Sequence, residues 1–170
     1  MAVFEGNKVT NNASNTNGGG AINMSNGNLK ITGYRFDNNS SAKLGGAIRT
    51  TNGNREITGA IFKNNYTTGN GGTGGAIHVE GANVDIKSTH FENNYTKKGD
   101  AYGGALYIKL ETGINENVGR VNTFVNNYIN DNKDNINHIF VNVTSSQLIE
   151  SPETSIGTGK EDDENITFGE

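Results

Sequence analysis

The sequence contains no cysteine and no tryptophan, and it has a single proline, Pro152. Without cysteine, the chain can form neither a disulfide scaffold, nor a thiolate metal site, nor a cysteine nucleophile. Apolar residues make up only 32% of its 170 residues, and no apolar run approaches the ~20 residues that a bilayer-spanning helix needs. We therefore expect one domain and no membrane-spanning segment in this chain.

Charge of either sign is sparse, and it is unevenly distributed. Residues 1–142 carry 13 basic and 11 acidic side chains, whereas residues 143–170 carry one basic and seven acidic, which together give the net charge of −4. A nearly neutral body has no row of cations that could follow a phosphate backbone, so we expect no nucleic-acid partner. So small a net charge also does not predict a disordered chain.

Glycine and asparagine are abundant, and both belong to an internal repeat. The first motif is Gly-Gly-Ala followed by Ile or Leu, and its later copies are evenly spaced. The second motif is Phe-x-Asn-Asn, which follows the glycine pair at the same distance in the first three copies. The glycine pairs are Gly19–Gly20, Gly45–Gly46, Gly74–Gly75 and Gly103–Gly104; the second motif contains Phe36, Phe62, Phe91 and Phe124 with Asn39, Asn65, Asn94 and Asn127.

Within each copy, apolar residues alternate with polar ones, as in Ile77-His78-Val79. This period of two indicates strands with one buried face. Short strands in so regular a repeat are typical of a solenoid, in which no single repeat buries its apolar face alone. The leucine-rich pattern and the calcium-binding glycine-aspartate nonapeptide are both missing. We predict an all-β fold, a right-handed parallel β-helix of about five rungs over residues 1–142, with residues 143–170 as an acidic C-terminal cap or tail.

A β-helix predicts a structural role for each of the repeated residues. The glycine pair allows a corner with positive φ. The four phenylalanines should stack inside the solenoid, one per rung. Of the two asparagines that follow each phenylalanine, one can form an internal amide ladder and the other can adopt the left-handed conformation at a bend.

These paired motifs resemble the repeats of chlamydial polymorphic outer-membrane proteins and of adhesin-like surface proteins from other bacteria and methanogenic archaea. The resemblance covers about residues 9–142 and implies a β-helix passenger domain, exposed on a cell surface and acting in adhesion. It implies a host- or neighbour-cell protein or glycan as partner, no cofactor and no catalytic residue, because the shared motifs are structural. The chain departs from the family in having no translocator segment and in losing Gly-Gly from its fifth copy. We expect it to be part of a longer protein.

Stacked rungs place equivalent outward residues in columns, and one pair of columns after Gly-Gly-Ala is rich in cationic and aromatic side chains. Such residues are common in binding hot spots, although the same columns would also suit an ordinary solvated face. If they bind nothing, the chain would be a structural stalk or spacer of a larger surface protein. The predicted binding residues are Arg49, His78, Tyr107, Phe140, Glu80 and Lys109.

A polysaccharide-active enzyme is the third hypothesis, because some β-helices cleave polysaccharides. Such enzymes need clustered carboxylates or a calcium site beside a base. Here the three histidines fall in different columns or in the degenerate copy, and the carboxylate pair Glu56–Asp85 offers too few oxygens for calcium. We therefore predict no catalytic residue and no metal site. Opposite charges in neighbouring rungs predict ion pairs that set the register: Lys30–Glu56, Asp37–Lys63 and Lys63–Glu92.

Overall fold

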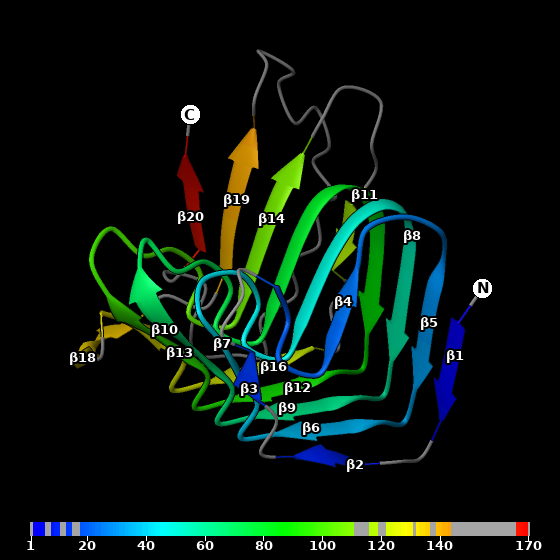
Figure 1. The fold of residues 1–170 in the computed structure, drawn as a ribbon, viewed down its shortest axis with the longest axis horizontal. Helices are drawn as coiled ribbons and strands as arrows, with labels where there is room; N and C mark the ends of the chain where they lie inside the picture. Colours follow the sequence, from blue (N-terminus) through cyan, green and yellow to red (C-terminus); the bar gives the residue numbers. More distant parts are fainter. Residues whose placement is uncertain are drawn as a thin grey trace.

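The computed structural model describes residues 2–5, 8–10, 13–14, 18–110, 116–118, 122–130, 132–136, 139–143 and 166–169. Within these residues the chain forms only strands, which lie in three sheets (Figure 1). All strand pairs are parallel except β17 with β18. The fold is therefore the predicted all-β, right-handed parallel β-helix.

The three sheets are named A, B and C in the order in which each rung visits them. Sheet A contains β1 (Ala2–Glu5), β4 (Ile22–Met24), β5 (Leu29–Thr32), β8 (Ile48–Thr58), β11 (Ile77–Lys87), β14 (Leu106–Leu110), β15 (Glu116–Val118), β19 (Ile139–Val143) and β20 (Ile166–Gly169). Sheet B contains β2 (Lys8–Thr10), β6 (Arg35–Asp37), β9 (Ile61–Lys63), β12 (His90–Glu92) and β16 (Thr123–Val125). Sheet C contains β3 (Ala13–Ser14), β7 (Ser40–Ser41), β10 (Tyr66–Asn70), β13 (Tyr95–Lys98), β17 (Tyr128–Ile129) and β18 (Asn132–Ile136).

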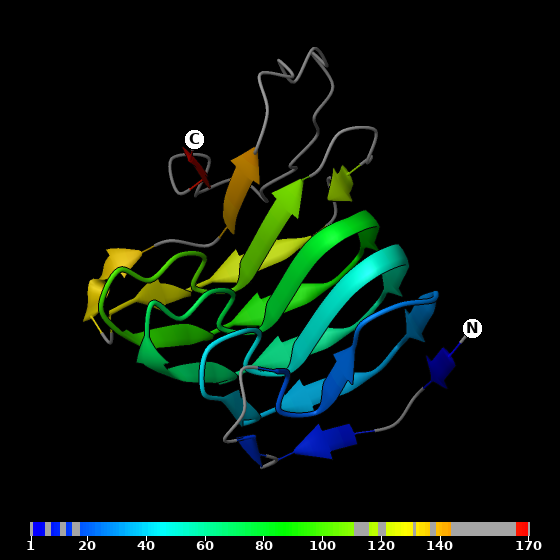
Figure 2. The same ribbon diagram turned by 45° about the horizontal axis from the view of Figure 1, so that its top comes forward.

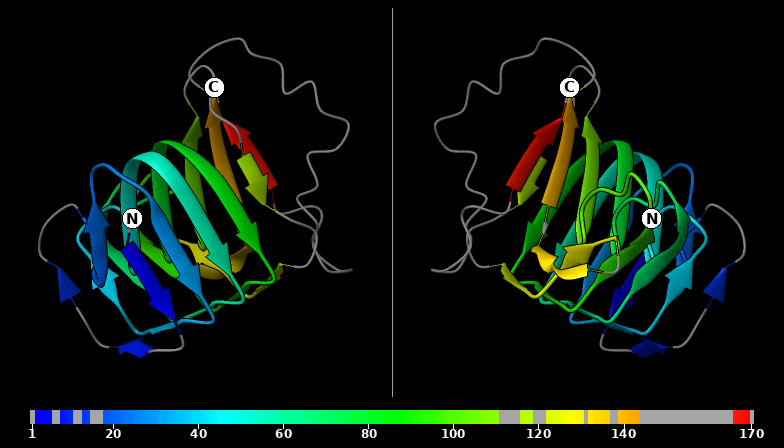
Figure 3. Two further views of the ribbon diagram at one scale, coloured as in Figure 1. Left: turned by 90° about the vertical axis from the view of Figure 1, so that its right-hand side faces the viewer. Right: turned by 90° about the vertical axis from the view of Figure 1, so that its left-hand side faces the viewer.

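Each rung runs up the first half of sheet A, bends, runs down the second half, crosses sheet B, enters sheet C and returns through a loop to the next Gly-Gly-Ala motif (Figure 1). Equivalent strands of successive rungs lie side by side (Figures 2 and 3). The four glycine motifs bound three complete turns, with partly described turns at both ends. The number of rungs therefore differs slightly from the five that we predicted. Most of the predicted cap or tail, residues 143–170, lies outside the described residues.

The phenylalanines form one internal stack on sheet B, as their matched spacing predicts. Successive ring centroids from Phe36 through Phe62 and Phe91 to Phe124 are 4.7, 5.1 and 4.8 Å apart, and the rings are nearly parallel. A second inward column on sheet A joins Ile48, Ile77, Leu106 and Ile139 in register. All these side chains are buried, so the core is built of like residues stacked on like.

The second asparagine of each motif lies in a buried ladder at the corner between sheets B and C. Asn65 Nδ2 donates to Asn94 Oδ1 at 3.0 Å and to the Phe36 carbonyl at 3.1 Å, while its Oδ1 accepts from Asn39 Nδ2 and from the Asn39 backbone N–H. Asn94 repeats these contacts with Asn127 and Phe62. The first asparagine adopts the left-handed conformation in every copy, with φ values of 55°, 55°, 52° and 50° at Asn38, Asn64, Asn93 and Asn126.

The two glycines of each pair are required for different reasons. The first glycine of the last three pairs has a positive φ, 58° at Gly45 and 63° at both Gly74 and Gly103. The second is crowded by the neighbouring rungs, because a Cβ on Gly75 would meet the carbonyl oxygen of Gly104 and the backbone nitrogen of Tyr95. The motif therefore combines a sharp corner with close backbone stacking.

Arg55 is a buried cation that the pattern analysis did not identify. It occupies an inward position between Leu29 and Val84 in neighbouring rungs, and 2% of it is exposed. Its Nη1 donates to the carbonyls of Gly27 and Asn54 at 2.6 and 2.9 Å, and its Nη2 to those of Thr51 and Asn52 at 2.9 and 2.5 Å. Burial lowers its pKa. Arg55 thus holds the bend in the middle of β8.

Candidate functional site

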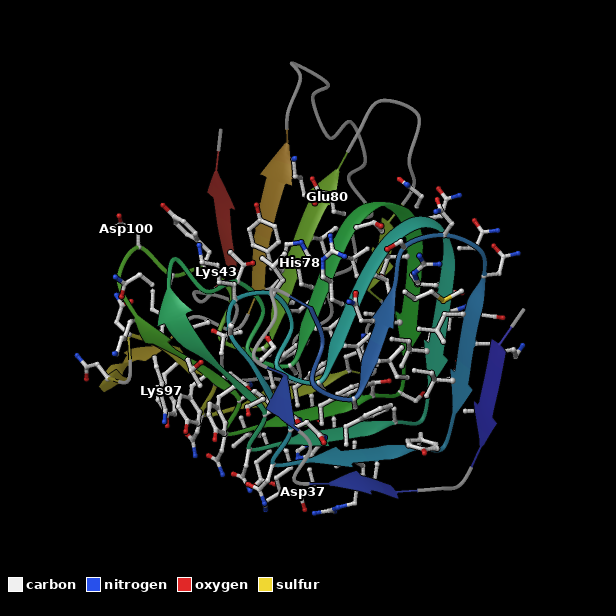
Figure 4. The ribbon with its side chains drawn as sticks, in the orientation of Figure 1. Asp37, Lys43, His78, Glu80, Lys97 and Asp100 are labelled. Atoms are coloured by element: carbon white, nitrogen blue, oxygen red, sulfur yellow. The ribbon has the colours of Figure 1, made fainter. Side chains whose placement is uncertain are left out.

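The predicted binding residues lie on the outer face of sheet A. Arg49, His78 and Tyr107 occupy the same position on β8, β11 and β14, and Glu80 and Lys109 are paired two residues further along. Figure 4 shows His78 and Glu80 on this face. Phe140 pairs with Tyr107 in register through β19, and its side chain lies outside the described residues.

The column formed by Arg49, His78 and Tyr107 is less exposed to solvent than we expected. His78 is 4% exposed and Tyr107 is 7% exposed, and their rings stack with centroids 4.9 Å apart. The cover comes from the loops that lead into sheet A, where Leu44, Thr73 and Tyr102 form a column of their own, and Thr73 Oγ1 lies 2.7 Å from His78 Nδ1. The expectation of a solvated face is therefore wrong for His78 and Tyr107, whereas Arg49, Glu80 and Lys109 stay partly exposed.

Charge on this face is concentrated at Glu80. Lys109 Nζ lies 2.6 Å from Glu80 Oε1, and His78 Nε2 lies 3.9 Å from Glu80 Oε2, which is too long for a hydrogen bond. The neighbouring His78 imidazole and Lys109 ammonium lower the pKa of Glu80 to about 2. Burial lowers the pKa of His78, so the imidazole is neutral near pH 7 beside a charged carboxylate.

Two adjacent buried nitrogen atoms on this face have no hydrogen-bond partner, Arg49 Nε and His78 Nε2. The tautomer in which the Thr73 hydroxyl donates to Nδ1 places the imidazole proton on Nε2, which makes both atoms donors. Buried polar groups in native proteins are almost always paired, with water or an ion if not with protein. In this tautomer, each of the two buried donors lacks an acceptor among the described residues.

The burial of His78 predicts a pH dependence of stability. We expect the free energy of unfolding to fall as the pH drops from 7 to 5, because the unfolded chain protonates this imidazole near 6.5, whereas burial lowers its pKa in the native state. Glu80 contributes outside this range, since its native pKa is about 2 and its stabilisation is lost only below 4.5. Urea unfolding at pH 7, 6 and 5 measures how steeply the free energy of unfolding changes with pH.

The matched control is His90, whose side chain is 37% exposed. His78→Gln should flatten the pH profile, and His90→Gln should leave most of the slope in place. A slope that persists undiminished in His78→Gln would contradict this assignment.

Sheet C carries a second aromatic stack, which we did not predict. The rings of Tyr66, Tyr95 and Tyr128 lie parallel, with centroids 5.0 and 4.9 Å apart, and Lys97 Nζ lies 4.7 Å from the centroid of Tyr66. The sequence contains the signal for this stack, because tyrosine directly follows Asn-Asn in three of the four copies and serine follows it in the first.

The remaining titratable residues are dispersed over the described part of the chain. Lys30–Glu56 and Lys63–Glu92 form the predicted ion pairs at 2.9 and 2.8 Å, and the Asp37 carboxylate lies 3.0 Å from Arg35. His90 lies on β12 of sheet B and not on the outer face of sheet A with His78, and His138 falls outside the described residues. Among the described residues no three His, Cys, Asp or Glu side chains could hold a metal ion together, and this part of the chain contains no helix suited to crossing a membrane.

No curated protein and no solved structure matches the chain. One family does: residues 34–51 match the Chlamydia polymorphic membrane protein (Chlamydia_PMP) repeat. The matched segment begins just before β6 and ends within β8, so it holds Phe36, Asn39 and the Gly45–Gly46 corner. The matching repeat belongs to a surface-protein family and not to a known enzyme family. The resemblance predicted from the motifs is thus confirmed in this segment, which matches the polymorphic membrane protein repeat and lies in a β-helix.

Proposed function

We propose that this chain is an adhesin-like module, displayed on a cell surface, that attaches to a protein or glycan of a host or neighbouring cell. The observation that supports this most directly is the polymorphic membrane protein repeat at residues 34–51. The fold suits the role because its core of stacked phenylalanine and asparagine is internal to the described rungs, which leaves the outer faces available for a partner.

The contact surface that we propose is the outer face of sheet A around Arg49, Glu80 and Lys109. These side chains are partly exposed, and beside them lie the unpaired donors Arg49 Nε and His78 Nε2. An acceptor oxygen of a glycan or of a peptide would bind the exposed part of the Arg49 guanidinium. Tyr107 contributes by holding the His78 ring through stacking.

The alternative is a purely structural spacer, in which the columns of sheet A bind nothing. Attachment of the purified chain to cells, together with a glycan array, separates the two functions. We expect Arg49→Ala to weaken attachment by roughly tenfold or more, the size of a hot-spot loss, and to leave the melting temperature nearly unchanged.

The matched control for Arg49→Ala is Lys30→Ala, which removes one positive charge from the part of sheet A beyond the bend of β8, where Lys30 pairs with Glu56. Lys30→Ala should attach as the unaltered chain does. Tyr107→Ala is a poor probe because Tyr107 is buried and its loss should lower stability and binding together. Undiminished attachment of Arg49→Ala, or equal losses in both variants, would favour the spacer.

A further inference from the structure

The outer face of sheet C carries a stack of tyrosine rings. We call the surface formed by Tyr66, Tyr95, Tyr128 and Lys97 the tyrosine face. Thr67 and Thr96, which alternate with the tyrosines, are fully buried, so the tyrosines point outward. Tyr66 and Tyr95 are partly exposed although their rings stack. Figure 4 shows Lys97 on this side of the molecule, away from His78 and Glu80.

The lysines of the three sheets also differ in their partners. Every lysine whose side chain is described on a strand of sheet A or B forms an ion pair with a carboxylate: Lys30–Glu56, Lys63–Glu92, Lys87–Asp85 and Lys109–Glu80. The two lysines on β13 of sheet C, Lys97 and Lys98, form no such pair within the described residues, and Lys97 lies over the ring of Tyr66 instead. Strands β7, β10, β13 and β17 contain no aspartate or glutamate. The charged residues of these four strands are thus two lysines, both on β13.

We propose that the tyrosine face binds an extended acidic polysaccharide. Lysine ammonium groups attract uronate carboxylates, and a phenol hydroxyl both donates to and accepts from sugar hydroxyls. The tyrosines recur once per rung, with ring centroids 5.0 and 4.9 Å apart, whereas both lysines lie on β13. Tyr66 and Tyr95 are the partly exposed pair of this row, because Tyr128 is 7% exposed. Rungs repeat at about the 4.8 Å spacing of neighbouring strands, which is on the order of the length of one sugar residue, so successive sugars can meet Tyr66 and Tyr95.

Two other polyanions fit this face less well. Bases of single-stranded nucleic acid bind by stacking on open aromatic faces, but here the faces of neighbouring rings are turned toward each other. Two unpaired lysines are also few for following a phosphate backbone. An acidic peptide would use the lysines but not the repeated row of hydroxyls. The polysaccharide uses both groups.

The test is titration of the full chain with polygalacturonate and with its fully methyl-esterified form, which has the same backbone without the charges. We expect binding to polygalacturonate at low salt and much weaker binding to the ester. The double variant Lys97→Gln/Lys98→Gln should weaken binding by about fivefold to tenfold, as expected for two exposed charge contacts. The double variant Tyr66→Phe/Tyr95→Phe retains the rings and should also weaken binding, because it removes two hydroxyls.

The matched control is Lys30→Gln/Lys87→Gln, which removes the same charge from sheet A. Equal weakening in this control would mean that only net charge matters and would overturn the proposal. So would an unaltered chain that does not bind polygalacturonate, or one that binds an oligodeoxythymidylate or polyglutamate more tightly. Because the sheet C substitutions leave Arg49 and its neighbours intact, cell attachment through sheet A can succeed or fail independently of this result.

Discussion

Replacing Phe62 with alanine should lower the free energy of unfolding by about 3–5 kcal/mol. Phe62 is fully buried, and its ring lies between those of Phe36 and Phe91, with centroids 4.7 and 5.1 Å away. The substitution removes a large apolar side chain and both of its aromatic contacts. Because the backbones of neighbouring rungs are hydrogen bonded above and below this position, the rungs cannot collapse into the space that is left.

Urea unfolding of the variant and of the unaltered chain measures this loss. The matched control is Val125→Ala on β16, one residue beyond the stacked Phe124, because Val125 is 39% exposed; its effect should stay within about 0.5 kcal/mol. A loss at Phe62 no larger than that at Val125 would mean that the stack does not hold the rungs together.

The stack and the amide ladder could be predicted from sequence for one physical reason. In a solenoid with a fixed repeat, residues at the same offset from a corner lie directly above one another. The constant offset between glycine pair and phenylalanine therefore determines the partners of Phe36, Phe62 and Phe91 without knowledge of any side-chain conformation. The same logic predicted the left-handed asparagines, because a bend must recur wherever the stack recurs.

The environment of the candidate site could not be predicted in this way. Alternation predicts that His78 points outward, which it does, but it cannot predict that the loop carrying Thr73 returns over the ring and buries it.

The inward position of Arg55 could not be predicted either, because it breaks the apolar pattern. The free-energy cost of burying the Arg55 charge is offset by hydrogen bonds to four backbone carbonyls, which come together only when the corner of β8 has formed.

The second large effect is expected at Asn65, which is fully buried in the amide ladder. Asn65→Ala removes the acceptor of Asn39 and the donor to the Phe36 carbonyl and to Asn94. Each buried polar group left unpaired costs about 1–3 kcal/mol, so the loss of stability should reach about 3 kcal/mol or more.

Asn65→Asp tests the direction of the hydrogen bonds in the ladder. The carboxylate keeps an acceptor for Asn39, but it places a second oxygen against the Phe36 carbonyl and Asn94 Oδ1, where Nδ2 donates in the native chain. This variant should be the less stable of the two near neutral pH. Its deficit relative to the unaltered chain should shrink as the pH falls, because a protonated carboxyl can donate again.

The neighbouring asparagine provides the control for both Asn65 variants. Asn64 has a φ of 55°, so Asn64→Gly keeps a residue that adopts this conformation easily and should change stability by only a few tenths of a kcal/mol. Urea unfolding measures the stability of the three variants. Near neutral pH we expect Asn64→Gly to be the most stable, Asn65→Ala to be less stable and Asn65→Asp to be the least stable. If Asn64→Gly cost as much as Asn65→Ala, the loss of either asparagine side chain would be equally damaging, and the amide ladder would not be what stabilises this corner. If the deficit of Asn65→Asp did not shrink in acid, its carboxylate would not face the acceptors described here.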